Sequence, residues 1–292
     1  MKQKWQQMLA IVVIVSACAP AAGAVNFTVG ANYWPSTWSI SSFPVLVAEG
    51  WQYGDVYGED HWENASSLDI TGAGLYGVNG LITFNSPWGI GFTLLRGSFD
   101  FEIDQTFTAQ IGNVTSTTLY QLEFGVDRTD LDLALNYRLN NNFTAFLGYK
   151  SLSYSYGEQT MLLSQTHVAP WGRRDDVPAP QQIASYEINY HGPGVGIAGS
   201  LPFGPSGLVF LGSVSFLPYF MAVESGRVDK LSDDTGWAVN AETGFAYVPG
   251  NMPFFGRLSF RYQRFDGFAM ADVDMNENQN FQGPLLLVGV RF

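Results

Sequence analysis

The chain of 292 residues has little cysteine, few basic residues and no long apolar run after its first 24 residues. Its one cysteine, Cys18, has no partner for an internal disulfide. Lysine and arginine number 14 against 26 acidic residues, and the net charge of −12 argues against nucleic acid as a partner, because nucleic acid is bound through clustered basic side chains. No later apolar stretch approaches the ~20 residues of a transmembrane helix, which excludes a helical membrane protein.

The first 24 residues have the three-part form of an export signal. Two lysines precede an apolar run over residues 8–15, and small residues at 22–24 suit a signal peptidase. The sequence therefore predicts a Sec signal peptide over residues 1–24 and one mature domain over residues 25–292. A second site, ending at Cys18, resembles a bacterial lipobox. We favour cleavage after Ala24, because strand-like alternation begins almost at once and leaves little tether.

After the signal segment the dominant pattern has a period of two, which is typical of β-strands. From Leu131 to Leu139, leucines and a tyrosine alternate with Asp, Ala, Asn and Arg. Across three asparagines the pattern restarts at Phe143 and continues to Lys150. This arrangement predicts an antiparallel hairpin closed by a tight turn.

The connections between such strands differ in length. Short turns rich in Gly, Pro and Asn are expected at 85–89, 140–142, 204–207 and 250–253, and long connections at 35–67, 102–126, 158–182, 225–235 and 267–281. About ten strands result, with eight or twelve as alternatives, because residues 117–126 fit either a strand extension or a separate strand. The expected strands are 25–34, 68–84, 90–101, 127–139, 143–157, 183–203, 208–223, 236–248, 254–266 and 282–292.

The final strand alternates Leu286, Val288 and Val290 and stops at Phe292. This ending resembles the C-terminal assembly signal of Gram-negative outer-membrane β-barrel proteins. The resemblance implies an all-β, transmembrane antiparallel barrel with short periplasmic turns, long extracellular loops and both termini in the periplasm. It further implies outer-membrane lipid, lipopolysaccharide, the barrel-assembly machinery and periplasmic chaperones as partners.

Charged residues of both signs fall at predicted inward positions of several strands. They are Asp132, Arg138, Lys150, Glu187, Glu242, Arg257, Arg261 and Arg291. Because eight strands leave an interior about filled by side chains and open channels need about sixteen, we expect a charge network that fills a ten-stranded lumen. The alternative is a charged constriction that selects solutes. The predicted function is therefore structural, binding or slow passage of small solutes, with a porin-like diffusion channel as the alternative.

An outer-membrane hydrolase acting at the extracellular rim is a further alternative. His191 follows Glu187 by four residues on the predicted inward face, but a separation of ~13 Å along a strand is too long for a direct acid–base pair. The paired aspartates and Asp-x-His of the omptin proteases have no match at the rim strands. We therefore expect no enzyme activity.

The long connections contain candidate binding residues. The first, 35–67, combines Trp38 and other aromatics with several carboxylates, and includes His61; we expect it to pack across the barrel mouth. Asp272, Asp274 and Asn276 begin like a calcium loop but lack its later ligands. No cofactor is expected beyond Ca²⁺ or Mg²⁺ held loosely at extracellular loops.

One expected strand, 90–101, conflicts with simple alternation. Arg96 and Asp100 share the parity of Ile90, Phe92 and Leu94. The inward or outward assignment of this strand therefore stays open, and a β-bulge is one way to reconcile these positions.

Overall fold

The computed structural model describes residues 25–40, 68–111, 113–157, 159–176, 181–183, 185–225, 234–250, 252–270 and 273–292. None of its helices within these ranges has the length and apolar character needed to cross a membrane. Almost all of the described residues are in β-strands.

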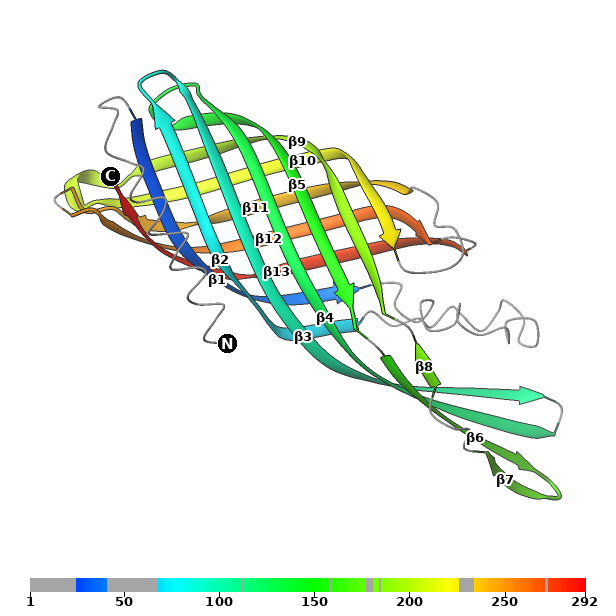
Figure 1. The fold of residues 1–292 in the computed structure, drawn as a ribbon. Helices are drawn as coiled ribbons and strands as arrows, with labels where there is room; N and C mark the ends of the chain where they lie inside the picture. The colour runs from blue at the N-terminus through cyan, green and yellow to red at the C-terminus, as the bar shows by residue number, and fades with distance from the viewer. Residues whose placement is uncertain are drawn as a thin grey trace.

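Ten antiparallel strands form a closed barrel (Figure 1). The ring closes because β3 pairs with both β2 and β4, and the order round it is β3-β2-β1-β13-β12-β11-β10-β9-β5-β4. The predicted ten-stranded antiparallel barrel is confirmed. Its strands are β1 (Val25–Ile40), β2 (Leu68–Phe84), β3 (Trp88–Ile111), β4 (Val114–Arg138), β5 (Phe143–Tyr156), β9 (Tyr186–Pro202), β10 (Leu208–Ser225), β11 (Asp234–Tyr247), β12 (Phe254–Met270) and β13 (Val273–Arg291).

The register fixes the tilt of the strands. Following cross-strand partners once round the ring from Phe27 returns to β1 at Ser39, a displacement of 39 − 27 = 12 residues. With ten strands about 4.8 Å apart and a rise of about 3.3 Å per residue, this displacement corresponds to a tilt of about 40°. The barrel is narrow enough for inward side chains to meet across it.

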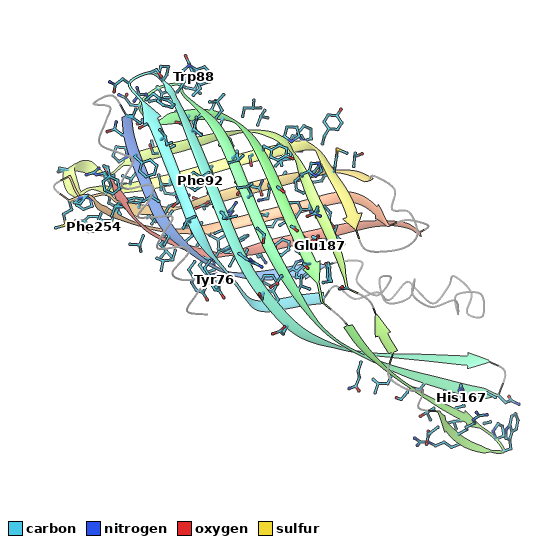
Figure 2. The ribbon with its side chains drawn as sticks, viewed as in Figure 1. Tyr76, Trp88, Phe92, His167, Glu187 and Phe254 are labelled. Carbon is cyan, nitrogen blue, oxygen red and sulfur yellow. The ribbon has the colours of Figure 1, made fainter. Side chains whose placement is uncertain are left out.

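Alternation along the strands separates an apolar outer face from an inner face that combines charged, polar and buried aromatic side chains. Trp88 and Phe254 lie near the end with the short turns, and Tyr76 lies farther along the wall (Figure 2). Large apolar residues exposed on the outer face include Tyr33, Leu94, Leu133, Leu135, Leu147, Val195, Ile197, Val214, Phe245, Leu258, Phe260, Leu286 and Val288. An apolar band of this kind is what a membrane barrel presents to lipid.

One end of the barrel carries the four short turns expected from the sequence. Backbone hydrogen bonds join neighbouring turns, including Arg138 N to Pro87 O and Val248 N to Gly207 O. Gly207 has a φ of 78° at the end of the short helix η3 (Gly204–Ser206), a left-handed conformation that favours glycine. Phe27 and Phe292 exchange backbone hydrogen bonds at the same end, so β1 begins where β13 finishes.

A sheet projects from the other end of the barrel (Figure 1). The pairing of β2 with β3 stops at Tyr76 and Arg96, but β3 and β4 stay paired to Ile111 and Val114. Residues 97–111 of β3 reach about 50 Å at about 3.3 Å per residue. The outer part of β4 also pairs with β6 (Gln159–Ala169), which pairs with β7 (Gly172–Asp176) and β8 (Gln181–Ile183).

Three expected loops are wrong, two of them because of this sheet. Residues 102–126 form the extended hairpin, so the strand-extension alternative for 117–126 is right, and 158–182 contains three strands. Strands β12 and β13 run to Met270 and from Val273, which leaves no long connection over 267–281. The sequence pattern missed these extensions because alternation in a sheet outside the apolar band lacks the lipid-facing residues that marked the other strands.

No bulge reconciles the charges in 90–101. Strand β3 pairs with β4 without a register shift, and both Arg96 and Asp100 are exposed on the outer face. The side chain of Arg96 approaches Asp127 to 3.9 Å there. The charges are accommodated because they lie past the apolar residues, near the point where the sheet leaves the barrel. A bulge does occur in β10, where the register shifts between Leu217 and Phe220.

Candidate functional site in the barrel lumen

Three inward positions of β4 carry charges at the centre of the lumen. Arg128, Asp130 and Asp132 alternate along the strand, so all three point to the inner side. Arg128 donates through Nε and Nη2 to the two carboxylate oxygens of Asp130, each at 2.7 Å. Both side chains are 0% exposed, so this bidentate pair is removed from solvent.

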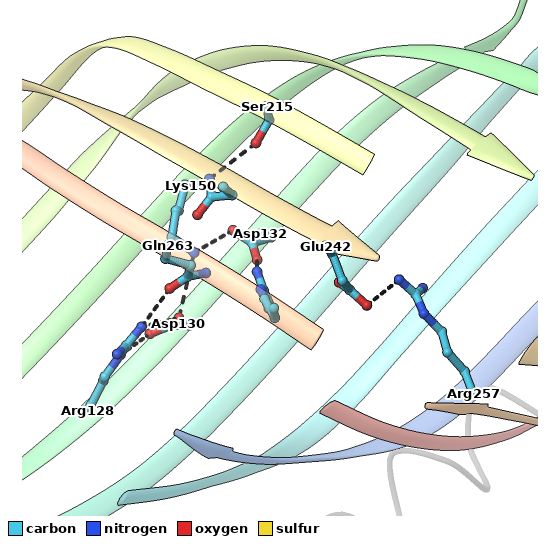
Figure 3. A network of polar contacts seen from close by, with 10 residues as sticks. Arg128, Asp130, Asp132, Lys150, Ser215, Glu242, Arg257 and Gln263 are labelled. Carbon is cyan, nitrogen blue, oxygen red and sulfur yellow. Dashed lines mark hydrogen bonds and ion pairs between the residues drawn. The ribbon is translucent and has the colours of Figure 1, made fainter. Parts of the chain in front are cut away.

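Side chains from β5 and β12 extend the pair into a network (Figure 3). Lys150 Nζ lies 2.8 Å from Asp132 and 3.6 Å from Asp130. Arg261 donates to Asp132 at 2.8 Å, and Gln263 accepts from Arg128 at 2.9 Å. Because β12 is five strands from β4 in the ring of ten, these contacts join opposite walls across the lumen.

A second ion pair lies nearer the short turns. Glu242 of β11 accepts hydrogen bonds from Arg257 and Ser259 of β12. Between this pair and the central network is a cavity of about 220 Å³, whose lining includes Asp132, Lys150, Ser213, Asn240 and Glu242. A polar space of this size accommodates water molecules.

Six aromatic side chains meet in the lumen on the side of the network away from the short turns. Trp38, Tyr154, Tyr190, Phe220, Phe265 and Phe281 come from six strands, and all are buried. Each ring contacts the next, and the series returns from Phe281 to Trp38, with centroid separations of 5.3 to 6.1 Å. We call these six residues the aromatic layer. They form a continuous ring of contacts inside the barrel wall.

Arg128 connects the aromatic layer to the ion network. Its guanidinium carbon lies 3.6 Å from the centroid of the Phe281 ring and 5.6 Å from that of Tyr154. A guanidinium over an aromatic face gains about 0.5 to 2 kcal/mol, and more when it is desolvated. One face of the cation is thus against the aromatic layer, while its nitrogens bind Asp130 and Gln263.

Exposure in the lumen rises toward the short turns. The Asp130 side chain is fully buried and Lys150 is 3% exposed, whereas Asp132 is 28% and Arg257 25% exposed. Among the described residues, the charged side chains of the lumen are thus most exposed near the short turns and most buried next to the aromatic layer. We call the part of the lumen between the central network and the short turns, where the 220 Å³ cavity lies, the vestibule.

The structure brings together five of the eight residues chosen from the sequence. Asp132, Lys150 and Arg261 are in the central network, and Glu242 pairs with Arg257. Arg138 lies by the short turns, and Arg291 donates there to the backbone oxygens of Pro249 and Met252.

The prediction for Glu187 is wrong, because its position on β9 has the parity of the outward residues Val195 and Ile197 and it is exposed. His191 has the same parity, and its ring lies 6.3 Å from the outward ring of Tyr149. The strand does not break at the glycines and proline that follow His191, so the expected inward placement fails. Neither side chain faces the lumen.

Sequence reasoning missed Arg128, Asp130 and Gln263, the most buried polar residues of the network. The sequence did contain a signal for Arg128 and Asp130. Both precede Asp132 at every second position, so they fall on the same inward face of the strand as Asp132. Trp38, expected in the first long loop, instead lies on β1 and belongs to the aromatic layer.

The proposed metal ligands fall where side chains are not described. Asp272 and His61 are outside the described residues, and for Asp274 and Asn276 only the backbone of β13 is described. Within the described part of the chain, no group of three or more His, Cys, Asp or Glu side chains is placed to hold a metal ion.

Comparison with known proteins identifies the fold. No protein-family model matches the chain, and no curated protein matches it in sequence. The chain is similar to the outer membrane protease OmpT from Escherichia coli, with 14% identity, a TM-score of 0.50, and coverage of 94% of this chain and 99% of OmpT. The chain has the fold of an outer-membrane β-barrel.

Two further barrels match more loosely. The toluene transporter TodX from Pseudomonas putida is 10% identical over 93% of this chain and 90% of its own. The translocator domain of the autotransporter NalP from Neisseria meningitidis is 10% identical over 100% of this chain and 95% of its own. Both TM-scores are 0.30, too low to support a structural argument.

Proposed function

We propose that the chain is a non-enzymatic barrel of a bacterial outer membrane, closed to free diffusion, that holds a β-sheet outside the cell in a structural or binding role. The observation that carries this proposal is the set of buried side chains that cross the lumen. The aromatic layer and the bonds from Arg128 to Gln263 and from Arg261 to Asp132 span the space between opposite walls, which supports a lumen closed to free diffusion.

The apolar outer face supports the location in the membrane. Outer-membrane barrels have short periplasmic turns, so we place the short-turn end in the periplasm and the projecting sheet outside. In this orientation the start of β1 and the end of β13 are periplasmic, the vestibule opens inward, and the aromatic layer faces the exterior. Lipopolysaccharide, the barrel-assembly machinery and periplasmic chaperones are the expected partners.

The placement of His191 supports a non-enzymatic role. A rim hydrolase that uses a histidine needs this side chain beside a nucleophile or an activated water. His191 is instead on the outer face against Tyr149, on the strand face opposite the lumen. The buried carboxylates of the lumen are ion-paired with Arg and Lys, which leaves them without the environment of a general base.

The projecting sheet supports a binding role. At the turn between β6 and β7, Trp171 is 80% exposed and Val168 is also exposed. Figure 2 shows His167 in this same hairpin, far from the barrel. Exposed apolar side chains at the end of such an extension are suited to contact with another molecule.

Thiol labelling in intact cells tests the closed lumen and the orientation together. In a Cys18→Ser background, Ser213→Cys places a thiol in the vestibule and Thr235→Cys places one at the opposite end of the barrel. A membrane-impermeant maleimide should label only Thr235→Cys in intact cells, and both after the outer membrane is permeabilised. Labelling of Ser213→Cys in intact cells would show an open lumen, and protection of Thr235→Cys would show the reverse orientation.

A further inference from the structure

The outer wall has a hollow where small residues of neighbouring strands come into register. One cross-strand row runs Phe143, Gly199, Gly212, Thr243, Phe260 across β5, β9, β10, β11 and β12. Two glycines and a threonine therefore form a low floor between two phenylalanine rings that are each exposed on the outer face. The hollow has a volume of about 480 Å³.

Larger apolar residues border this floor on its other sides. Ile197, Leu201, Phe210 and Val214 line the hollow along β9 and β10. Phe210 is held in place by an edge-to-face contact with Phe245 at 5.5 Å. The floor at Gly212 is open, because a Cβ built there would meet nothing closer than the Glu242 carbonyl oxygen at 4.0 Å.

The polar groups at the hollow are already bonded within the barrel wall. The Thr243 hydroxyl donates to the Leu211 carbonyl oxygen at 3.3 Å, and the Tyr262 hydroxyl donates to Asn280 at 3.1 Å. Glu242, which adjoins the hollow, belongs to the inner face and is paired with Arg257. No charged side chain of the described residues faces the hollow from outside, so its chemistry matches an uncharged hydrocarbon and not a polar ligand.

The position of the hollow identifies which hydrocarbon is available. Phe143 is the first residue of β5, Gly199 is near the end of β9, and Gly212 is near the start of β10, so the row lies toward the short turns. In the orientation of the proposed function, on which this inference rests, that half of the barrel faces the periplasmic leaflet. This leaflet consists of phospholipid, whereas lipopolysaccharide occupies the other.

We propose that the hollow over Gly199, Gly212 and Thr243 is a specific binding site for one acyl chain of a periplasmic-leaflet phospholipid. The chain lies on the glycine floor between the Phe143 and Phe260 rings and replaces the side-chain volume that the wall lacks there. The site differs from general contact with lipid, because a chain seated in a preformed hollow is contacted on several sides and exchanges more slowly than its neighbours.

Native mass spectrometry of the full chain, refolded and extracted in mild detergent, tests the site with dipalmitoyl phosphatidylethanolamine as the probe. The parent should retain one lipid at detergent concentrations that remove the rest. Gly212→Leu fills the hollow from a position where a Cβ meets nothing closer than 4.0 Å, and it should lower the retained fraction roughly tenfold, the effect of losing contact with two or more methylene groups. Gly256→Leu is the matched control, because Gly256 is also on the outer face with no atom within 4 Å of a built Cβ, and it should retain lipid like the parent.

Two outcomes would overturn the site. In one, the parent retains no lipid at the detergent concentrations that remove the rest. In the other, Gly212→Leu and the parent retain lipid equally. Retention of purified lipopolysaccharide in preference to the phospholipid would contradict the assignment to the periplasmic leaflet. None of these substitutions touches the lumen, so thiol labelling of the vestibule reports separately on the closed barrel.

Discussion

The guanidinium of Arg128 is bound on two sides, by the Asp130 carboxylate at 2.7 Å and by the face of Phe281 at 3.6 Å. Asp130 occupies the inward position of β4 next to that of Asp132, two residues earlier in the chain. Asp132 in turn accepts hydrogen bonds from Lys150 and Arg261. The contact between Arg128 and Phe281 is therefore the point at which the ion network and the aromatic layer meet. A barrel that conducts solutes would leave this point open to water, whereas here Arg128 is fully buried.

Breaking the Arg128–Asp130 pair on one side should destabilise the barrel strongly. Asp130→Ala leaves a buried guanidinium without its carboxylate, and the expected loss in the free energy of unfolding is about 3 to 5 kcal/mol. Removing both charges with Arg128→Met and Asp130→Leu should cost less than the single change, because no unpaired charge remains. Urea unfolding in lipid vesicles measures both. A double variant less stable than Asp130→Ala would contradict the buried pair.

Close approach of strands at Gly283 should make this position intolerant of a side chain. A Cβ there would lie 2.2 Å from the Pro35 carbonyl oxygen of the neighbouring strand. Gly283→Ala should therefore lower the free energy of unfolding by about 1 to 3 kcal/mol through overpacking. Gly256→Ala is the control, since its Cβ meets no atom within 4 Å, and it should leave the urea midpoint nearly unchanged. Equal midpoints for the two variants would show that the wall relaxes at Gly283.

The sequence allowed the barrel to be predicted because its strands carry lipid-facing residues at every second position. Leu131 to Leu139 and Phe143 to Lys150 show this most clearly, and the structure pairs them as the expected hairpin. The pattern does not fix where a strand ends outside the apolar band. The extensions of β3 and β4 were therefore read as a loop.

Parity along single strands identified much of the lumen network but not its contacts. Asp132 and Arg261 were both expected to point inward, yet their bond depends on β4 and β12 lying on opposite sides of the ring. The aromatic layer was not predicted, because its six members are separated by up to 243 positions in sequence and come together only through closure and tilt. The prediction for Glu187 was wrong because the sequence suggested a strand break at the glycines and proline after His191. Strand β9 instead continues through these residues, so Glu187 keeps the outward parity of Val195 and Ile197.

Acid should loosen the hairpin at the end of the projecting sheet. Hydrogen bonds from Arg173, with a further one from the Thr166 hydroxyl, lower the pKa of Asp175 below its ordinary value of 3.8. A lowered carboxyl pKa means that the stabilisation is complete above pH 3.8 and is lost as the pH falls through the lower folded value. NMR shifts of the residues 173–175 amides should change in that window and stay flat in Asp175→Asn. A parent titrating at or above pH 3.8 would contradict the hydrogen bonds.

Phe292 should matter for assembly more than for stability. Leu286, Val288 and Phe292 are exposed on the outer face, as the predicted assembly signal requires, while Val290 is partly covered. Phe292→Ser should reduce the amount of folded barrel in the outer membrane, because recognition by the assembly machinery is lost. Its yield on refolding in detergent should match the parent, measured by heat-modifiable migration in gels. Equal loss in cells and in detergent would assign Phe292 to stability instead.

The closed lumen is tested most directly by conductance of the refolded barrel in a planar bilayer at high salt. The parent should show no stepwise openings. The double variant Trp38→Ala with Phe281→Ala removes two adjoining members of the aromatic layer, which stack at 5.3 Å, and should open a conducting path through the vestibule. Current steps from this variant would show that the parent lacks openings because its lumen is closed and not because it failed to insert into the bilayer. Stable openings of the parent itself would contradict the account and make the ion network the lining of a channel.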